Sequence, residues 1–146
     1  MSASPTRSSP VCLQLALGGE LRAGRHIVRF DDVELSLTNS SFQLLAELAR
    51  ARLATRTGLT PPPRDYDEKN LLHQNVRRLR KALDEALGPR AGRDLILHGA
   101  GSRYSLALDP STIAIDESLR EVAPYHLPKG LVDDLLLLRS RSDRGS

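Results

Sequence analysis

The sequence predicts a single α+β domain made of a small antiparallel sheet, two helices and a β-hairpin. Three observations support this prediction. Strand-forming runs between Gly and Asp turns come first, two stretches with apolar residues at helical spacing follow, and two β-rich arms around glycines come next. A length of 146 residues with 40% hydrophobic residues suits one domain with a core and is too short for two large domains.

The sheet is expected to begin just after residue 10. Residues 1–10 are rich in Ser and Pro, which favours a disordered tail. From Val11 onward, the runs VCLQLAL, HIVRF and VELSL are separated by Gly18-Gly19 and by the turn-prone pair Asp31-Asp32. The pattern predicts about three or four short antiparallel strands.

The first helix is expected from residue 40 to about residue 53, with 57 as its furthest end. Ser40 and Gln43 have the spacing of a capping box, and Thr38 is an alternative cap. Gly58 and the three prolines that follow it would end the helix. The apolar residues at helical spacing are Phe42, Leu45, Leu48 and Ala49.

The second helix is predicted over residues 67–87, with Asp67 as its cap and Gly88-Pro89 as its stop. At 100° per residue it has an apolar side and a polar side. The apolar side consists of Leu72, Val76, Leu79 and Leu83. The polar side consists of Asn70, His73, Gln74, Arg77 and Lys81. One side can therefore enter a core while the other meets a polyanion.

Positive charge is concentrated on this part of the chain. Residues 69–93 hold seven Lys and Arg residues against two acids, Asp84 and Glu85, although the whole chain has a net charge of only +3. The remaining chain is therefore net negative. Such a distribution indicates an anion-binding surface better than it indicates general solubility.

The second half of the chain predicts a hairpin followed by an extension. Residues 95–108 form two β-rich arms around Gly99 and Gly101, with Arg103 at the tip. Residues 109–138 are expected as a partly helical extension, with a short strand at TIAID and a helical turn or two at DESLREVA. The run LVDDLLLL at 131–138 either packs on its own domain or forms a partner or homodimer contact. Its candidate contact residues are Leu131, Leu135 and Leu138. Residues 139–146 are expected to be a disordered tail.

The order of strands, helix, basic helix and glycine-tipped hairpin is that of a winged helix-turn-helix. Residues 11–108 resemble the OmpR/PhoB-type winged-helix domain of bacterial transcription regulators, with its N-terminal antiparallel sheet and C-terminal β-hairpin wing. The similar stretches are LTNSSFQLLAEL at 37–48, NVRRLRKAL at 75–83 and HGAGSRYSL at 98–106. The letters ALDP after the hairpin are also similar to SARP-type regulators, which carry a similar winged helix.

This resemblance implies binding to double-stranded DNA. In the family, arginines at the positions of Arg77, Arg78 and Arg80 touch DNA backbone or bases, and a wing residue near Arg103 reaches the minor groove. The residues themselves agree in part, because Asn and Gln side chains can pair bidentately with adenine. The resulting DNA-binding candidates are Asn70, His73, Gln74, Arg77, Arg78, Arg80, Lys81 and Arg103. The sequence favours neither of two roles for His73, which can be an ordinary surface histidine or a residue that contacts bases.

Two other binding functions are open. The stretch TRTGLTPPPRDY stands where the family has its second helix, and its prolines prevent a full helix. A winged-helix protein-interaction module that has lost DNA binding is therefore the alternative to a transcription regulator. RNA binding is less favoured, because two Phe, three Tyr and no Trp leave few platforms for stacking bases.

Other classes of function find little support in the sequence. There is no complete dinucleotide loop, phosphate loop or nucleophile elbow, so we expect no enzyme and no cofactor. The single cysteine, Cys12, excludes an internal disulfide and a Cys-based zinc site, and His26, His98 and His126 are too scattered to suggest a metal. No apolar run is long enough for a membrane span or a signal peptide, so we expect a cytoplasmic protein.

Overall fold

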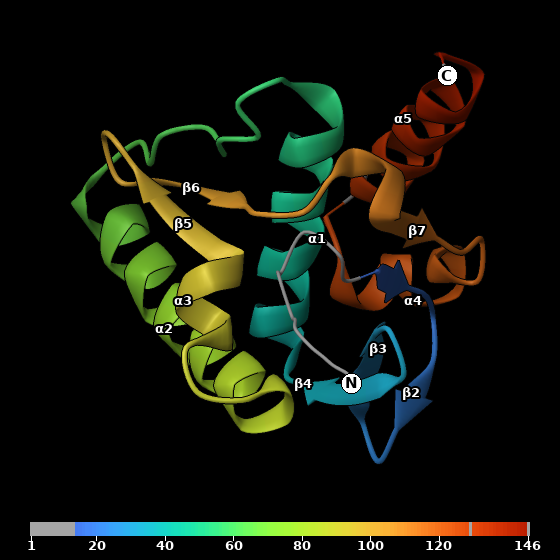
Figure 1. Ribbon diagram of the computed structural model, residues 1–146, viewed down its shortest axis with the longest axis horizontal. Coiled ribbons are helices and arrows are strands. Elements are labelled where there is room, and N and C mark those ends of the chain that lie inside the picture. The colour runs from blue at the N-terminus through green and yellow to red at the C-terminus, as the bar shows by residue number, and fades with distance from the viewer. Residues whose placement is uncertain (1–13, 129, 146) are drawn as a thin grey trace, which may run out of the picture.

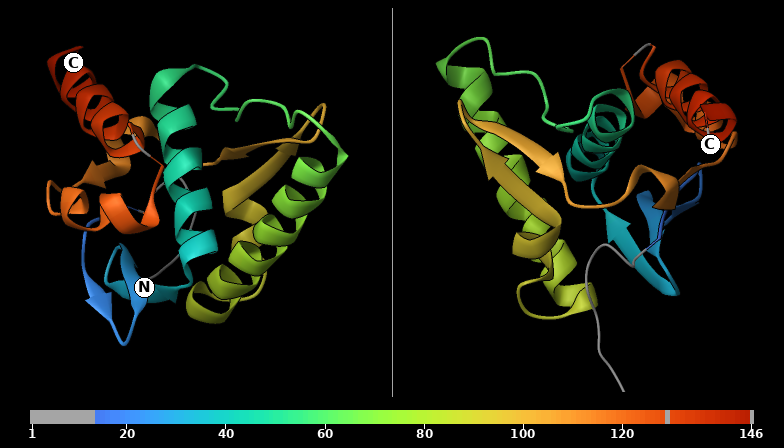
Figure 2. Two further views of the ribbon diagram at one scale, coloured as in Figure 1. Left: turned by 180° about the vertical axis from the view of Figure 1, so that it is seen from behind. Right: turned by 45° about the horizontal axis from the view of Figure 1, so that its top comes forward.

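The computed structural model describes residues 14–128 and 130–145, which form an α+β fold. Helix α1 (Asn39–Ala54) lies in the middle. On one side of it lie α2 (Tyr66–Leu87) and a hairpin, and on the other lie a larger sheet and the last two helices (Figures 1 and 2). The predicted tail at residues 1–10 falls outside the described residues.

The larger sheet is built around its longest strand, β3. The strands are β1 (Leu15–Leu17), β2 (Leu21–Arg22), β3 (Arg25–Phe30), β4 (Val33–Leu37) and β7 (Ile113–Ile115). β3 pairs antiparallel with β1, β2 and β4, as the sequence predicts. The short strand expected at TIAID is β7, which pairs parallel with β1, placing Leu15 opposite Ile113. The residues after 108 therefore complete the sheet that the first residues begin.

Helix α1 carries core residues on several of its sides. Its N-cap is Thr38, whose side chain accepts the N–H of Ser41 at 3.4 Å, so the alternative cap is the one used. Ser40 lies inside the first turn instead. Phe42 is fully buried, and its ring stacks on buried His26 of β3 with centroids 4.0 Å apart. The helix ends at Ala54, before Gly58 and the prolines, as expected.

A short helix, α3 (Ala91–Leu95), leads from α2 into the hairpin of β5 (Ile96–Gly99) and β6 (Arg103–Leu106). No helix was predicted at the position of α3. It packs tightly on α2, because a Cβ added at Gly92 would lie 2.4 Å from the carbonyl oxygen of Arg80. The N–H of Gly92 also donates to Asp84 Oδ1 at 2.7 Å. A glycine here fixes how closely the hairpin approaches α2.

The C-terminal part contains a 3₁₀ turn (Pro110–Thr112), α4 (Leu119–His126) and α5 (Leu131–Gly145). Leu131 and Leu135 are 1% and 0% exposed within the protein's own core, and Leu138 is half-buried. Packing on the same domain is therefore confirmed, and a partner contact through Leu131 and Leu135 is wrong. The helix also continues through residues 139–145, where a disordered tail was expected. Extending an anchored helix adds one hydrogen bond per residue and needs no new nucleus.

None of the helices in the described residues combines the length and apolar content that crossing a lipid bilayer requires.

Candidate nucleic-acid interface

The N-terminus of α2 is fixed by a local network of polar groups. Asp65, rather than the predicted Asp67, is the N-cap, and its Oδ1 accepts the N–H of Glu68 at 2.8 Å. Glu68 in turn accepts the backbone N–H of Arg64 at 3.0 Å. The helix therefore starts at Tyr66, directly after a segment without helix or strand, and ends at Leu87 before Gly88.

The two sides of α2 differ as the sequence predicts. Val76, Leu79 and Leu83 are buried in the core, and Leu72 is partly buried against it. The opposite side carries five exposed polar residues, called here the outer stripe: Asn70, Gln74, Arg77, Arg78 and Lys81. They stand at positions i, i+4, i+7, i+8 and i+11, which fall on one face of a helix and span about 16 Å along its axis.

The cations of the outer stripe have no ion-pair partner within the described part of the chain. Salt bridges do form elsewhere on the surface, such as Arg120 with Asp133 at 2.7 Å. Arg77, Arg78 and Lys81 take part in no such pair with any described residue. Arg77 and Lys81 are one helical turn apart, where like charges repel each other. An anion placed beside them would relieve this repulsion.

His73 points toward the hairpin and not along the outer stripe. It is half-buried, and its Nδ1 is hydrogen-bonded to the hydroxyl of Tyr104 on β6. The Tyr104 ring also stacks on His98 of β5, with centroids 4.9 Å apart. Burial raises the pKa of the Tyr104 phenol, and the charge of Arg80 partly opposes this. Three rings thus join α2 to the hairpin, and His73 is held away from the position of a base reader.

Arg80 is likewise turned toward the hairpin. Its Nη2 donates to the carbonyl oxygen of Ile96 at 2.6 Å, and its Cζ lies 5.7 Å from the centroid of the Tyr104 ring. Its Nε is buried without a hydrogen-bond partner among the described residues. Arg80 is therefore a positioning residue at the edge of the outer stripe.

Arg103 lies directly after the turn at the hairpin tip, and its side chain is engaged by the linker. It is the first residue of β6, and its Nε donates to the carbonyl oxygen of Thr60 at 2.8 Å. Side chains alternate along a strand, so Arg103 lies on the opposite face of the hairpin from Tyr104. Arg103 pairs with Gly99 directly after the turn at 100–102, and its contact with DNA stays a prediction.

The proline-containing linker pairs with the hairpin. The N–H of Thr60 donates to the carbonyl oxygen of Tyr104 at 2.8 Å, and the N–H of Tyr104 donates to Thr60 Oγ1 at 3.2 Å. Residues 55–65 contain no helix. The stretch that the sequence could not assign therefore follows the edge of β6 and connects α1, the hairpin and the start of α2.

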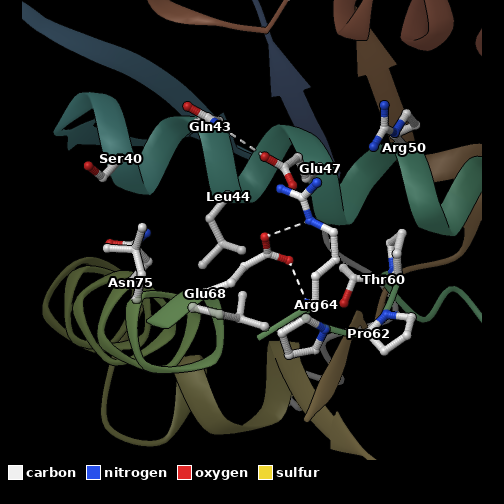
Figure 3. Close-up of a pocket in the computed structure, with 14 residues that line it drawn as sticks. Ser40, Gln43, Leu44, Glu47, Arg50, Thr60, Pro62, Arg64, Glu68 and Asn75 are labelled. Atoms are coloured by element: carbon white, nitrogen blue, oxygen red, sulfur yellow. Dashed lines mark hydrogen bonds and ion pairs between the residues drawn. The ribbon is translucent and has the colours of Figure 1, made fainter. Parts of the chain in front are cut away.

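A cleft of about 490 Å³ remains between α1 and the N-terminal half of α2 (Figure 3). Leu44 lies on the α1 side and Asn75 on the α2 side, and the prolines 61–63 also line the cleft. Arg64 reaches into it, with its Nε 3.0 Å from Glu68 Oε2. Asn75 Oδ1 is buried without a hydrogen-bond partner in the described residues.

Four residues of the site were not predicted from the sequence: Thr60, Asn75, His98 and Tyr104. One signal was available, because alternation along the hairpin places His98 and Tyr104, which pair in register, on the same face. In the described ranges, no three His, Cys, Asp or Glu side chains gather closely enough to hold a metal ion. Comparisons with protein-family models, curated proteins and solved structures found no match for this chain.

Proposed function

We propose that this chain is a sequence-specific double-stranded-DNA-binding protein of winged-helix type that acts as a transcription regulator. The single observation that carries the proposal is the outer stripe of α2, in which two amides are followed along the helix by three cations without ion-pair partners among the described residues. A helix of this kind fits the major groove of B-DNA, where Arg and Lys contact phosphates or guanine and Asn and Gln read adenine.

In this proposal the residues have separate roles. Arg77, Arg78 and Lys81 contact phosphates or guanine edges, and Asn70 and Gln74 contact bases. The β5–β6 hairpin is the wing beside the recognition helix. Three side chains hold α2, the hairpin and the linker together. His73 and Arg80 of α2 are hydrogen-bonded to the hairpin, and Arg103 of the hairpin is hydrogen-bonded to the linker. The linker takes the place of the second helix.

The test is a polarisation titration of labelled duplex DNA at several salt concentrations. Arg77→Ala should lower the slope of log affinity against log salt by about 0.9, the loss expected for one phosphate contact on B-DNA. Arg120→Ala is the matched control, because this substitution removes the same charge at a distant place. Arg120 belongs to α4, which lies across α1 from α2 (Figure 1). Unchanged affinity and slope in Arg77→Ala would contradict the proposal. Selection from a random duplex library tests sequence preference.

A second function is favoured by the cleft between α1 and α2. A protein-interaction module would bind its partner at this cleft. Leu71 lines the cleft, and its side chain is 57% exposed. If the chain is such a module, it should form a stable complex with a protein partner. It should show no salt-dependent binding to duplex DNA at physiological ionic strength. Leu71→Asp should then disrupt the complex, since Leu71 lies on the surface and its substitution leaves the core intact.

A further inference from the structure

A recess of about 620 Å³ lies between α2 and β6, on the side of the hairpin that faces α2. Its polar lining consists of His73, Arg77, Arg80, Lys81, Asp84 and Tyr104. It is separate from the cleft of Figure 3, because no residue lines both. The residues that bridge helix and hairpin form its walls, so two elements have to stay in place for the recess to exist.

The charges in this recess are unbalanced. Three cations face one carboxylate, and that carboxylate, Asp84, already accepts the N–H of Gly92 at 2.7 Å. No ion pair joins any of these three cations, Arg77, Arg80 and Lys81, to another described residue. Arg77 stands three residues before Arg80 and four residues before Lys81 on one helix, where like charges repel. An anion in the recess would remove this repulsion.

Arg80 is held in place before any ligand arrives. Its Nη2 is fixed on the Ile96 carbonyl oxygen, and the Tyr104 ring lies against it. Because Nε has no hydrogen-bond partner among the described residues, the guanidinium is incompletely satisfied and its charge is not neutralised by a neighbour. Arg77 and Lys81 are exposed at the mouth and can turn their donors inward. A fixed cation with two adjustable cations suits a tetrahedral oxyanion.

We infer that this recess binds a phosphate group, held by Arg77 and Lys81 through charge-assisted hydrogen bonds and by the field of Arg80. The phosphate belongs either to the DNA backbone, in which case the inference rests on the proposed function, or to a free phosphorylated molecule. Both sources present the same phosphate group to the recess. They differ in whether added pyrophosphate competes with duplex DNA for the protein.

The first arm of the test is an NMR titration of the full chain with inorganic pyrophosphate at constant ionic strength. Backbone amides of residues 73–84 and of Tyr104 should shift in a saturable manner. Lys81→Ala should weaken this binding about tenfold, the loss expected for one charge-assisted hydrogen bond. Lys69→Ala is the matched control, because Lys69 is an exposed lysine of the same helix that lies outside the recess, and this substitution should leave pyrophosphate binding unchanged. Lys81 is exposed, so folding is unaffected, which a thermal melt verifies.

The second arm adds pyrophosphate to the duplex titration. If pyrophosphate weakens duplex binding by the wild type but not by Lys81→Ala, the recess holds a backbone phosphate. If pyrophosphate binds in the recess without affecting duplex binding, or when no duplex binds, a free phosphorylated ligand is the source and the inference stands. Absence of localised, saturable shifts, or equal losses in Lys81→Ala and Lys69→Ala, would overturn the inference even with duplex binding intact.

Discussion

Leu79→Ala tests the face assignment of α2, on which every functional argument depends. Leu79 is 0% exposed in the core, so the substitution removes about three buried carbon groups, worth about 0.8 kcal/mol each. The cavity that remains adds about 1 kcal/mol. The free energy of unfolding should therefore fall by about 3 to 4 kcal/mol.

Leu71→Ala is the matched control, because it makes the same chemical change on the same helix at a side chain that is 57% exposed. Little apolar surface is lost and no cavity forms, while Ala gains a few tenths of a kcal/mol in helix propensity. Its cost should stay below about 1 kcal/mol.

The measurement is urea unfolding followed by far-UV circular dichroism, since the chain has no Trp for a fluorescence signal. The denaturation midpoint should fall strongly for Leu79→Ala and hardly for Leu71→Ala, with an unchanged slope m. If Leu71→Ala costs as much as Leu79→Ala, then α2 does not present the outer stripe to solvent. The proposed DNA contacts and the phosphate recess would then both lose their basis.

Two further predictions concern the linker and the sheet surface. Thr60→Val preserves the shape of the side chain but removes the acceptor for the buried N–H of Tyr104. It should lower the free energy of unfolding in urea by about 1 to 3 kcal/mol. Thr57→Val is the control, and it should lower the free energy of unfolding little because Thr57 is exposed. Hydrogen bonds from two arginines of β2 and β3 lower the pKa of the Glu34 carboxyl. Because the folded pKa lies below the unfolded one, this stabilisation is present above the unfolded pKa and is lost as pH falls through the folded value. NMR titration of Glu34 should show the low pKa, and the stability difference between wild type and Glu34→Gln should vanish in acid; a difference that persists there would contradict this reasoning.

Much of the fold could be predicted because its signals are local. The spacing of Val76, Leu79 and Leu83 alone identifies the buried side of α2, since a helix repeats every 3.6 residues. The turn at Asp31-Asp32 and the hairpin around Gly99 and Gly101 likewise depend on neighbouring residues. The cap of α2 was predicted at Asp67 and lies at Asp65, because both residues suit an N-cap and only the path of the preceding chain decides between them.

The rest could not be predicted because it depends on contacts between distant residues. Arg80 and Arg78 look equivalent in the sequence, yet the Ile96 carbonyl oxygen fixes the first and leaves the second exposed. Thr60 has no periodic neighbour that would reveal its pairing with β6. The leucines at 131 and 135 could have covered either their own core or a partner, and the direction of α5 relative to α1 decides this. The DNA-binding role of the outer stripe stays a prediction.

The parallel pairing of β1 with β7 has a consequence for how the chain folds. Leu15 and Ile113 are partners although most of the chain lies between them. During synthesis, one edge of β1 therefore waits unpaired until β7 is made, and an open strand edge is a template for incorrect pairing. Contacts between distant residues also slow folding, because a long loop has to be closed before they form. The rate of folding should thus depend on this late strand more than on the long helix α2, whose hydrogen bonds are all local.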